Sequence, residues 1–114
     1  MAIELIFTKY TQEGCAAIVD GGYVARRAAL DKIVTDVGGR LVGYWATDDG
    51  EWDSVMIIEG DGAPAGSATA NLRGRASGQV ERMRRYRLYN PDETDATLDL
   101  LAGVTWPGAT GPSS

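Results

Sequence analysis

The chain has 114 residues, a length that fits one domain with a single hydrophobic core. It contains no histidine and one cysteine, which excludes Cys/His zinc sites, Ser-His-Asp or Cys-His catalysis and an intramolecular disulfide. A net charge of −5 argues against general nucleic-acid binding, and no apolar stretch is long enough to cross a bilayer. An all-carboxylate Mg²⁺ or Ca²⁺ site is the kind of metal site that composition leaves open. With no signal-peptide pattern, we expect a cytoplasmic protein without metal or cofactor.

The first part of the sequence predicts a strand and a helix. Residues 2–8 are rich in Ile, Leu and Phe and alternate weakly, as a strand does. Residues 11–22 are small and turn-prone, with room for a short helix. Residues 23–37 carry apolar side chains at helical spacing, and Gly38-Gly39 ends that run.

A β-hairpin is the clearest local prediction. Residues 40–59 form two strand-like runs around Asp49-Gly50, a pair typical of a tight two-residue turn. Such a loop places Tyr44 opposite Val55. The two predicted faces consist of Val42, Tyr44, Asp53, Val55 and Ile57 on one side and Leu41, Trp45, Trp52, Met56 and Ile58 on the other. Because both faces are largely apolar, we expect helices to cover one and a partner sheet to cover the other.

The remaining elements complete a recognisable order. A weak helix over residues 67–76 and a strand over 79–89 precede a short helix over 91–101, whose acidic first turn suits the helix dipole. The order β-α-β-β-α-β predicts an α+β, ferredoxin-like sandwich: a four-stranded antiparallel sheet with two helices on one face.

The C-terminal residues differ in composition from the rest. Residues 103–114 are rich in Gly, Pro, Thr and Ser and are predicted to be a tail, so that the domain spans residues 1–102. Trp106 is the large apolar side chain of the tail, and we expect it to anchor this segment.

The hairpin also carries a motif that resembles the signature of GYD-domain proteins, and the similarity spans about residues 3–93. The residues of the motif are Gly43-Tyr44-Trp45 and Gly50-Glu51-Trp52-Asp53. The resemblance implies a dimeric α/β barrel, in which two such sheets pack face to face. Proteins of that fold include cofactor-free oxygenases, haem-degrading enzymes and cyclases. A resemblance to the GYD group does not by itself indicate one activity. Trp52 stands where the family usually has tyrosine, and the turn is one residue longer.

Three polar residues near the helix and the hairpin form the first candidate site. Arg26 lies at the N-terminal end of the apolar helix stripe, and Tyr44 and Asp53 share a predicted hairpin face. Together they are suited to hold a carboxylate or enolate and to move a proton, with Asp53 as partner or general base. We favour a structural ion pair between Arg26 and Asp53 over a catalytic pair.

A second candidate comes from the basic strand that ends near residue 89. Arg82 and Arg84 belong to this cluster, and we favour an edge strand protected by charge, with some arginines paired to acids such as Glu4. A second interpretation places Arg82, Arg84 and Tyr86 in a pocket for an anion. A third is nucleic-acid binding, which the net charge disfavours.

The glycines of residues 60–66 follow a strand and precede a helix, but their spacing is wrong for a nucleotide-binding loop, so we expect a flexible turn. The function that fits best is a GYD-like domain that binds a small anionic or aromatic molecule and pairs with itself as a dimer or larger oligomer. The alternatives are a cofactor-free oxygenase or cyclase, and an interaction module recruited through its tail. We expect neither nucleic acid nor a membrane as partner.

Overall fold

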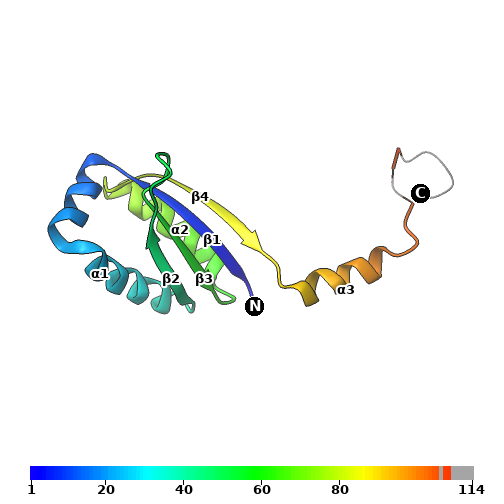
Figure 1. Ribbon diagram of the computed structural model, residues 1–114. Coiled ribbons are helices and arrows are strands. Elements are labelled where there is room, and N and C mark those ends of the chain that lie inside the picture. The colour runs from blue at the N-terminus through cyan, green and yellow to red at the C-terminus, as the bar shows by residue number, and fades with distance from the viewer. Residues whose placement is uncertain (106, 109–114) are drawn as a thin grey trace.

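A computed structural model describes residues 1–105 and 107–108 of the chain. Its elements are β1 (Ile3–Tyr10), α1 (Gln12–Asp36), β2 (Arg40–Ala46), β3 (Ser54–Glu59), α2 (Ala63–Ala76), β4 (Val80–Leu88) and α3 (Pro91–Leu101). The strands form one antiparallel sheet in the order β2-β3-β1-β4. Helices α1 and α2 lie on the same face of this sheet (Figure 1). This is the ferredoxin-like arrangement, so the predicted fold class is confirmed.

The core lies between the sheet and the two helices. Side chains of β1 point alternately to the two faces, and every second one from residue 4 to residue 10 is buried. Ile6, at the centre of β1, is fully buried. The core cluster consists of Ile6, Val34, Leu41, Tyr44, Met56, Ile58 and Ala63.

The opposite face of the sheet, called the open face below, is covered by no helix of the described residues. Its apolar side chains follow from the strand register and are Ile3, Leu5, Phe7, Trp45, Val55, Ile57, Tyr86 and Leu88. Trp45 is 49% exposed and Tyr86 46% exposed. The expectation that helices cover one face and leave the other bare is therefore met in the single chain.

Helix α1 is longer than predicted. It begins after Thr11, whose hydroxyl accepts a hydrogen bond from the backbone N–H of Gly14 at 3.1 Å and so caps the first turn. The small residues of 11–22, expected to be mostly turn, are helical up to Gly22. There the backbone leaves the helical region, with φ of 85° and ψ of 162°, and the helix kinks.

The hairpin loop is wider than the predicted two-residue turn. β2 ends at residue 46 and β3 begins at residue 54. Gly50 has the positive φ expected of a turn glycine. The Asp49 carboxylate accepts hydrogen bonds from the backbone N–H groups of Glu51 at 2.9 Å and Trp52 at 2.7 Å. These hydrogen bonds lower the pKa of the Asp49 carboxyl, and the bond from Trp52 has the larger effect. They also fold the loop around the Asp49 side chain.

The predicted hairpin register is wrong by one residue. Tyr44 lies opposite Met56, whereas a two-residue turn would place it opposite Val55. β2 also contains a bulge, in which Val42 is the extra residue. As a result Leu41 and Tyr44, three residues apart, are both buried on the helix face.

The glycines between β3 and α2 permit close helix packing. A Cβ at Gly62 would lie 2.4 Å from the Val37 carbonyl oxygen, and a Cβ at Gly66 would lie 2.7 Å from the Val37 side chain. These glycines therefore let the end of α1 approach the start of α2, which accounts for them without phosphate binding.

Strand β4 is at the edge of the sheet, as predicted, and carries four arginines. Glu4, expected to pair with one of them, is buried and instead accepts a hydrogen bond from the Ser67 hydroxyl. Arg85 donates to the same Ser67 oxygen at 3.0 Å. The buried carboxylate is thus satisfied through a hydroxyl from α2 rather than by a direct ion pair.

Helix α3 leads away from the sheet and packs against none of the other elements of the described chain (Figure 1). The molecule consequently extends over 62 × 29 × 23 Å. Trp106, expected to anchor the tail, lies outside the described residues, and the boundary at residue 102 stays a prediction. None of the helices in residues 1–105 combines the length and the apolar run that spanning a bilayer demands.

Candidate functional site

A cavity of about 340 Å³ lies between the sheet and the helices α1 and α2. Most of its wall is apolar and comes from the core, including Ile6, Leu30 and Met56. The polar side chains that reach it are Thr8, Tyr10, Arg26, Tyr44, Ser67, Arg73, Ser77 and Gln79. Among the described residues of the wall there is no carboxylate, thiol or imidazole. An apolar space with a few convergent polar groups is the usual form of a small-molecule site.

Two tyrosines meet at one side of this cavity. The hydroxyl of Tyr10 shares a 2.7 Å hydrogen bond with the hydroxyl of Tyr44 and a 3.0 Å hydrogen bond with that of Ser54. All three residues are buried. Burial and the hydrogen bond with Tyr10 hold the pKa of Tyr44 well above its usual value. Tyr44 is therefore a neutral phenol at physiological pH, able to donate or accept a hydrogen bond.

Arg26 is the positive group beside the tyrosines. Its guanidinium lies 5.5 Å from the centre of the Tyr10 ring and donates a 3.0 Å hydrogen bond to the side-chain oxygen of Gln79. Arg73 reaches the cavity from α2. Neither arginine forms an ion pair with a carboxylate of the described residues. The cavity is thus positively charged without a compensating acid in its wall.

The start of α1 positions Gln79, and through it Arg26. The backbone N–H of Thr11 donates to the Gln79 carbonyl at 3.0 Å, and the Thr11 hydroxyl donates to the Gly78 carbonyl. Gly14 lies directly against the same segment, since a Cβ there would be 2.1 Å from the Gln79 carbonyl oxygen. The first turn of α1 and the loop before β4 are therefore held in one fixed arrangement.

Of the five candidate residues, the structure brings Arg26 and Tyr44 into the same cavity and places the other three elsewhere. Asp53 does not line the cavity. Its carboxylate accepts a 2.9 Å hydrogen bond from the backbone N–H of Tyr10, and its own N–H donates to the Thr8 carbonyl. The expected Arg26–Asp53 ion pair is not formed, because Arg26 bonds Gln79. Asp53 instead joins the end of the hairpin loop to the end of β1.

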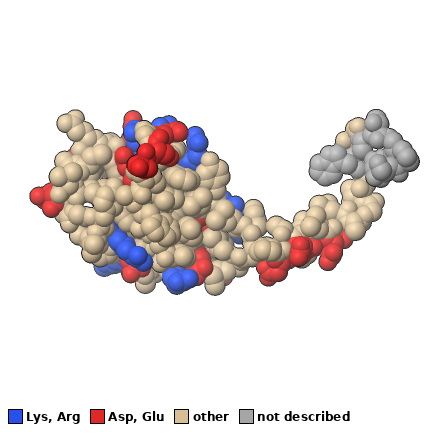
Figure 2. Space-filling model, in the orientation of Figure 1, with Lys and Arg blue, Asp and Glu red and all other residues tan. Residues whose placement is uncertain are grey.

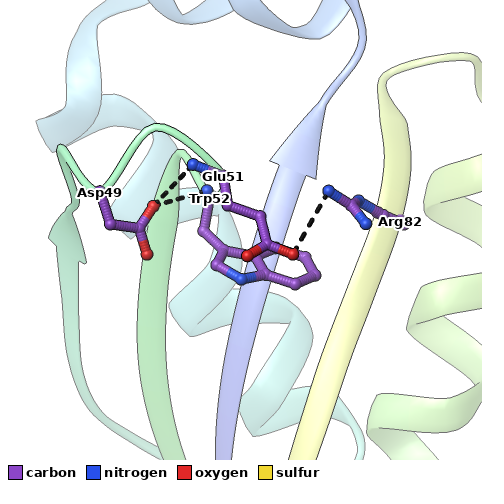
Figure 3. Close-up of polar contacts among 4 residues, drawn as sticks. All are labelled: Asp49, Glu51, Trp52 and Arg82. Atoms are coloured by element: carbon purple, nitrogen blue, oxygen red, sulfur yellow. Dashed lines mark hydrogen bonds and ion pairs between the residues drawn. The ribbon is translucent and has the colours of Figure 1, made fainter.

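Arg82 and Arg84 lie on the open face, on the other side of the sheet from the cavity. Their guanidinium groups lie 4.8 Å and 5.3 Å from the ring centre of Trp52. Arg82 also reaches Glu51 at 3.6 Å, as Figure 3 shows together with the Asp49 loop. Trp52 is buried by these neighbours and by Phe7, whose ring centre is 6.0 Å away. The arrangement holds the hairpin loop against the sheet, as cation–π stacking does.

Sequence reasoning missed further residues of the site: Tyr10, Arg73 and Gln79 line the cavity, and Ser54 hydrogen-bonds Tyr10. Tyr10 continues the alternation of β1, and extending the predicted strand by two residues would have found it. Arg73 lies in the predicted second helix, but no periodic pattern marks its inward side. Ser54 and Gln79 carry no sequence signal, because the hairpin register and the contact with Thr11 decide their positions.

No model of a known protein family matches the chain, and no curated protein matches it. Among solved structures it is similar to an uncharacterized NIPSNAP domain protein from Burkholderia xenovorans, with 19% identity, a TM-score of 0.45, and coverage of 79% of this chain and 94% of that one. It is also similar to an uncharacterized NIPSNAP-like domain protein from the same organism, with 16% identity, a TM-score of 0.47, and coverage of 99% and 97%. The fold assignment rests on the strand order and pairing of this chain, since likenesses at this level carry no argument about the site.

Removing the Tyr44 hydroxyl is expected to change how stability depends on alkaline pH. In the native protein the raised pKa keeps Tyr44 protonated, whereas the unfolded phenol ionises above about pH 10. The native state then binds more protons than the unfolded state, so stability falls as pH rises past that value. Tyr44→Phe should lose about 1 kcal/mol at neutral pH through its lost hydrogen bond, but should decline less between about pH 8 and about pH 11.

Urea unfolding at several pH values measures both effects. Tyr89→Phe, which removes a phenol that is 60% exposed, is the matched control and should follow the wild type. Parallel alkaline declines in wild type and Tyr44→Phe would show that Tyr44 is not the group responsible.

Proposed function

We propose that the protein binds a small aromatic or alicyclic molecule carrying a carboxylate in the cavity beneath α1 and α2. The observation that carries the proposal is the wall itself: apolar over most of its area, with Arg26 and Arg73 and no acidic group among its described residues. An apolar ring system would occupy the interior, and its carboxylate would provide the negative charge that the wall lacks.

The tyrosines add selectivity to this site. The Tyr10 hydroxyl already bonds both Tyr44 and Ser54, whereas the Tyr44 hydroxyl has capacity for a second interaction. A carboxylate next to Arg26 would accept a hydrogen bond from a tyrosine as well as from the guanidinium. A molecule of the same shape without the acid would leave these groups unpaired, which is costly in a buried site.

The wall favours binding over catalysis. A general base near neutral pH is usually a histidine or a carboxylate. The chain has no histidine, Asp53 is engaged with the β1 backbone, and Tyr44 has a raised pKa. The oxygenase or cyclase alternative therefore has no observation in its favour here.

We further propose that the chain is a GYD-like domain and pairs with a second copy through the open face. The apolar side chains of this face support the pairing, because exposing them all to water is costly. Contiguous apolar patches on a sheet commonly mark an interaction surface, and a second copy presents the same patch in return.

Replacing Arg26 with methionine is expected to weaken binding of aromatic carboxylates about 10- to 100-fold, the range expected from losing one charge-assisted hydrogen bond. The fold should persist, because Arg26 makes no ion pair with the described residues. The measurement is ligand-observed NMR followed by calorimetry. The probes are benzoate, salicylate and 1-naphthoate, each paired with its neutral primary amide.

The matched control is Lys32→Met, which removes an exposed positive charge from the same helix and should leave binding unchanged. Two results would overturn the proposal. One is that no carboxylate of the panel binds with a Kd below about 1 mM. The other is that Arg26→Met binds the carboxylates as tightly as the wild type does.

A further inference from the structure

Helix α3 has the features of an arm that requires a partner. None of its residues is buried, and it has two distinct sides. Helical spacing places Asp92, Asp95 and Asp99 on one side and Leu98 and Leu101 on another. Figure 2 shows the acidic side chains gathered along one side of the arm. Leu98 is 64% exposed and Leu101 is 47% exposed in the single chain.

Strand β4 is the complementary surface. Residues 80–88 carry four arginines and one glutamate, whereas residues 91–101 carry four acids and no basic residue. β4 is an edge strand, so its outer backbone groups and both rows of arginine side chains remain accessible. The most basic and the most acidic elements of the chain are therefore neighbours in sequence that do not pack on each other.

The link between them keeps α3 off its own strand. Two residues separate β4 from α3, and the second, Asn90, is extended with φ of −69° and ψ of 150°. Pro91 favours this conformation because it disfavours the helical region for the residue before it. The arm consequently continues outward from the strand instead of turning back onto it (Figure 1).

We propose that α3 of one copy docks on β4 of a second copy, with the acids of α3 facing the arginines and its leucines against the neighbouring apolar side chains. A two-fold arrangement makes the exchange reciprocal, since each copy offers one arm and one strand. The charges favour a second copy as the partner, because the arm and the strand of the same chain carry opposite charge. The contact is separate from the cavity, it meets the edge of the open face at Arg84, and it is weakened by salt because the charges are exposed.

Charge exchange between two variants tests the docking. The arm variant is Asp95→Lys with Asp99→Lys, which keeps the acids of the first helical turn that suit the helix dipole. The strand variant is Arg84→Glu with Arg87→Glu, which leaves the Arg85–Ser67 and Arg82–Glu51 contacts intact and keeps Arg82 on the Trp52 ring when the Arg84 stacking is lost. Sedimentation gives the Kd of association. Amide hydrogen exchange reports protection of α3, for the wild type, each variant and their equimolar mixture.

In the wild type, protection of α3 should rise with protein concentration. Each variant alone should lose this protection and associate at least about tenfold more weakly, a difference of about 1.4 kcal/mol. The mixture should regain both, because the basic arm of one then meets the acidic strand of the other. Ile57→Asp, which acts on the open face, separates failure of that pairing from failure of the arm contact.

Four results would overturn the proposal. Protection of α3 that is independent of protein concentration would mean docking within one chain, and absence of protection at every concentration would mean no docking. If each variant on its own associated as tightly as the wild type, the charges would not hold the arm. The same would follow if the mixture had a Kd of association no lower than that of either variant.

Discussion

Replacing Gly14 with alanine is expected to lower the free energy of unfolding by about 1–3 kcal/mol, the range of overpacked sites. The added Cβ would lie 2.1 Å from the carbonyl oxygen of Gln79 and 3.0 Å from its carbon. Both obstacles are backbone atoms, so no side-chain rotation relieves them. The first turn of α1 or the loop before β4 must move, and the hydrogen bonds of Thr11 to that loop hold both in place.

Gly21→Ala is the matched control, with an effect of opposite sign. Gly21 also lies in α1, and no atom is within 4 Å of a Cβ built there. Alanine should therefore stabilise by about 0.5–1 kcal/mol through helix propensity alone. Thermal and urea unfolding of the two variants measures the difference. If Gly14→Ala matched Gly21→Ala, the contact between α1 and Gln79 would not be tight.

The Gly14 variant also affects the cavity. Gln79 accepts the hydrogen bond that holds Arg26, so a shift of its backbone moves this acceptor. We expect Gly14→Ala to weaken binding of an aromatic carboxylate even where the protein remains folded.

Replacing Ile57 with aspartate is expected to raise the Kd of the proposed open-face dimer at least about 100-fold. Burial of one such side chain is worth about 1.5–3 kcal/mol, and a two-fold interface buries it in both copies. The new carboxylate adds the cost of desolvating a charge on each side. Because Ile57 lies on the face away from the core, the monomer should keep its fold.

Sedimentation and circular dichroism together check this prediction. The control is Val19→Asp, the same kind of change at a side chain that is 87% exposed, on helix α1 at the other face of the sheet (Figure 1). It should leave association unchanged. A wild type that is monomeric at micromolar concentration, or an Ile57→Asp variant that associates normally, would count against the open-face dimer.

Much of the fold could be predicted because local signals agree with the global one. Helical spacing of apolar residues located the second part of α1, and Asp49-Gly50 located the hairpin turn. For the first part of α1 the sequence predicted turns with room for a short helix, because its glycine and alanine content weakens the signal of a helix that Thr11 caps.

The candidate site was predictable in part, and the reason lies in strand register. The inward position of Arg26 could be predicted from helical spacing, because that spacing does not depend on where the helix begins or ends. Tyr44 and Asp53 were placed through a two-residue turn, and side-chain carboxylate contacts to the loop backbone widened that turn instead. No pattern in a single strand reveals such contacts, so the position of Asp53 could not be derived from spacing.

The bulge at Val42 lets β2 hold one extra residue while Tyr44 stays in the site. Successive side chains of a regular strand point to opposite faces, so two residues three apart, such as Leu41 and Tyr44, would lie on opposite faces. The bulge inserts one unpaired residue between them and keeps both on the helix face. With Val42 present, Leu41 fills the core and Tyr44 still reaches the cavity. Deleting this one exposed residue would close the bulge into a regular ladder, with Gly43 still opposite Ile57 and Tyr44 still opposite Met56. The loss of this one residue from β2 should therefore leave the Tyr44 side chain in the cavity.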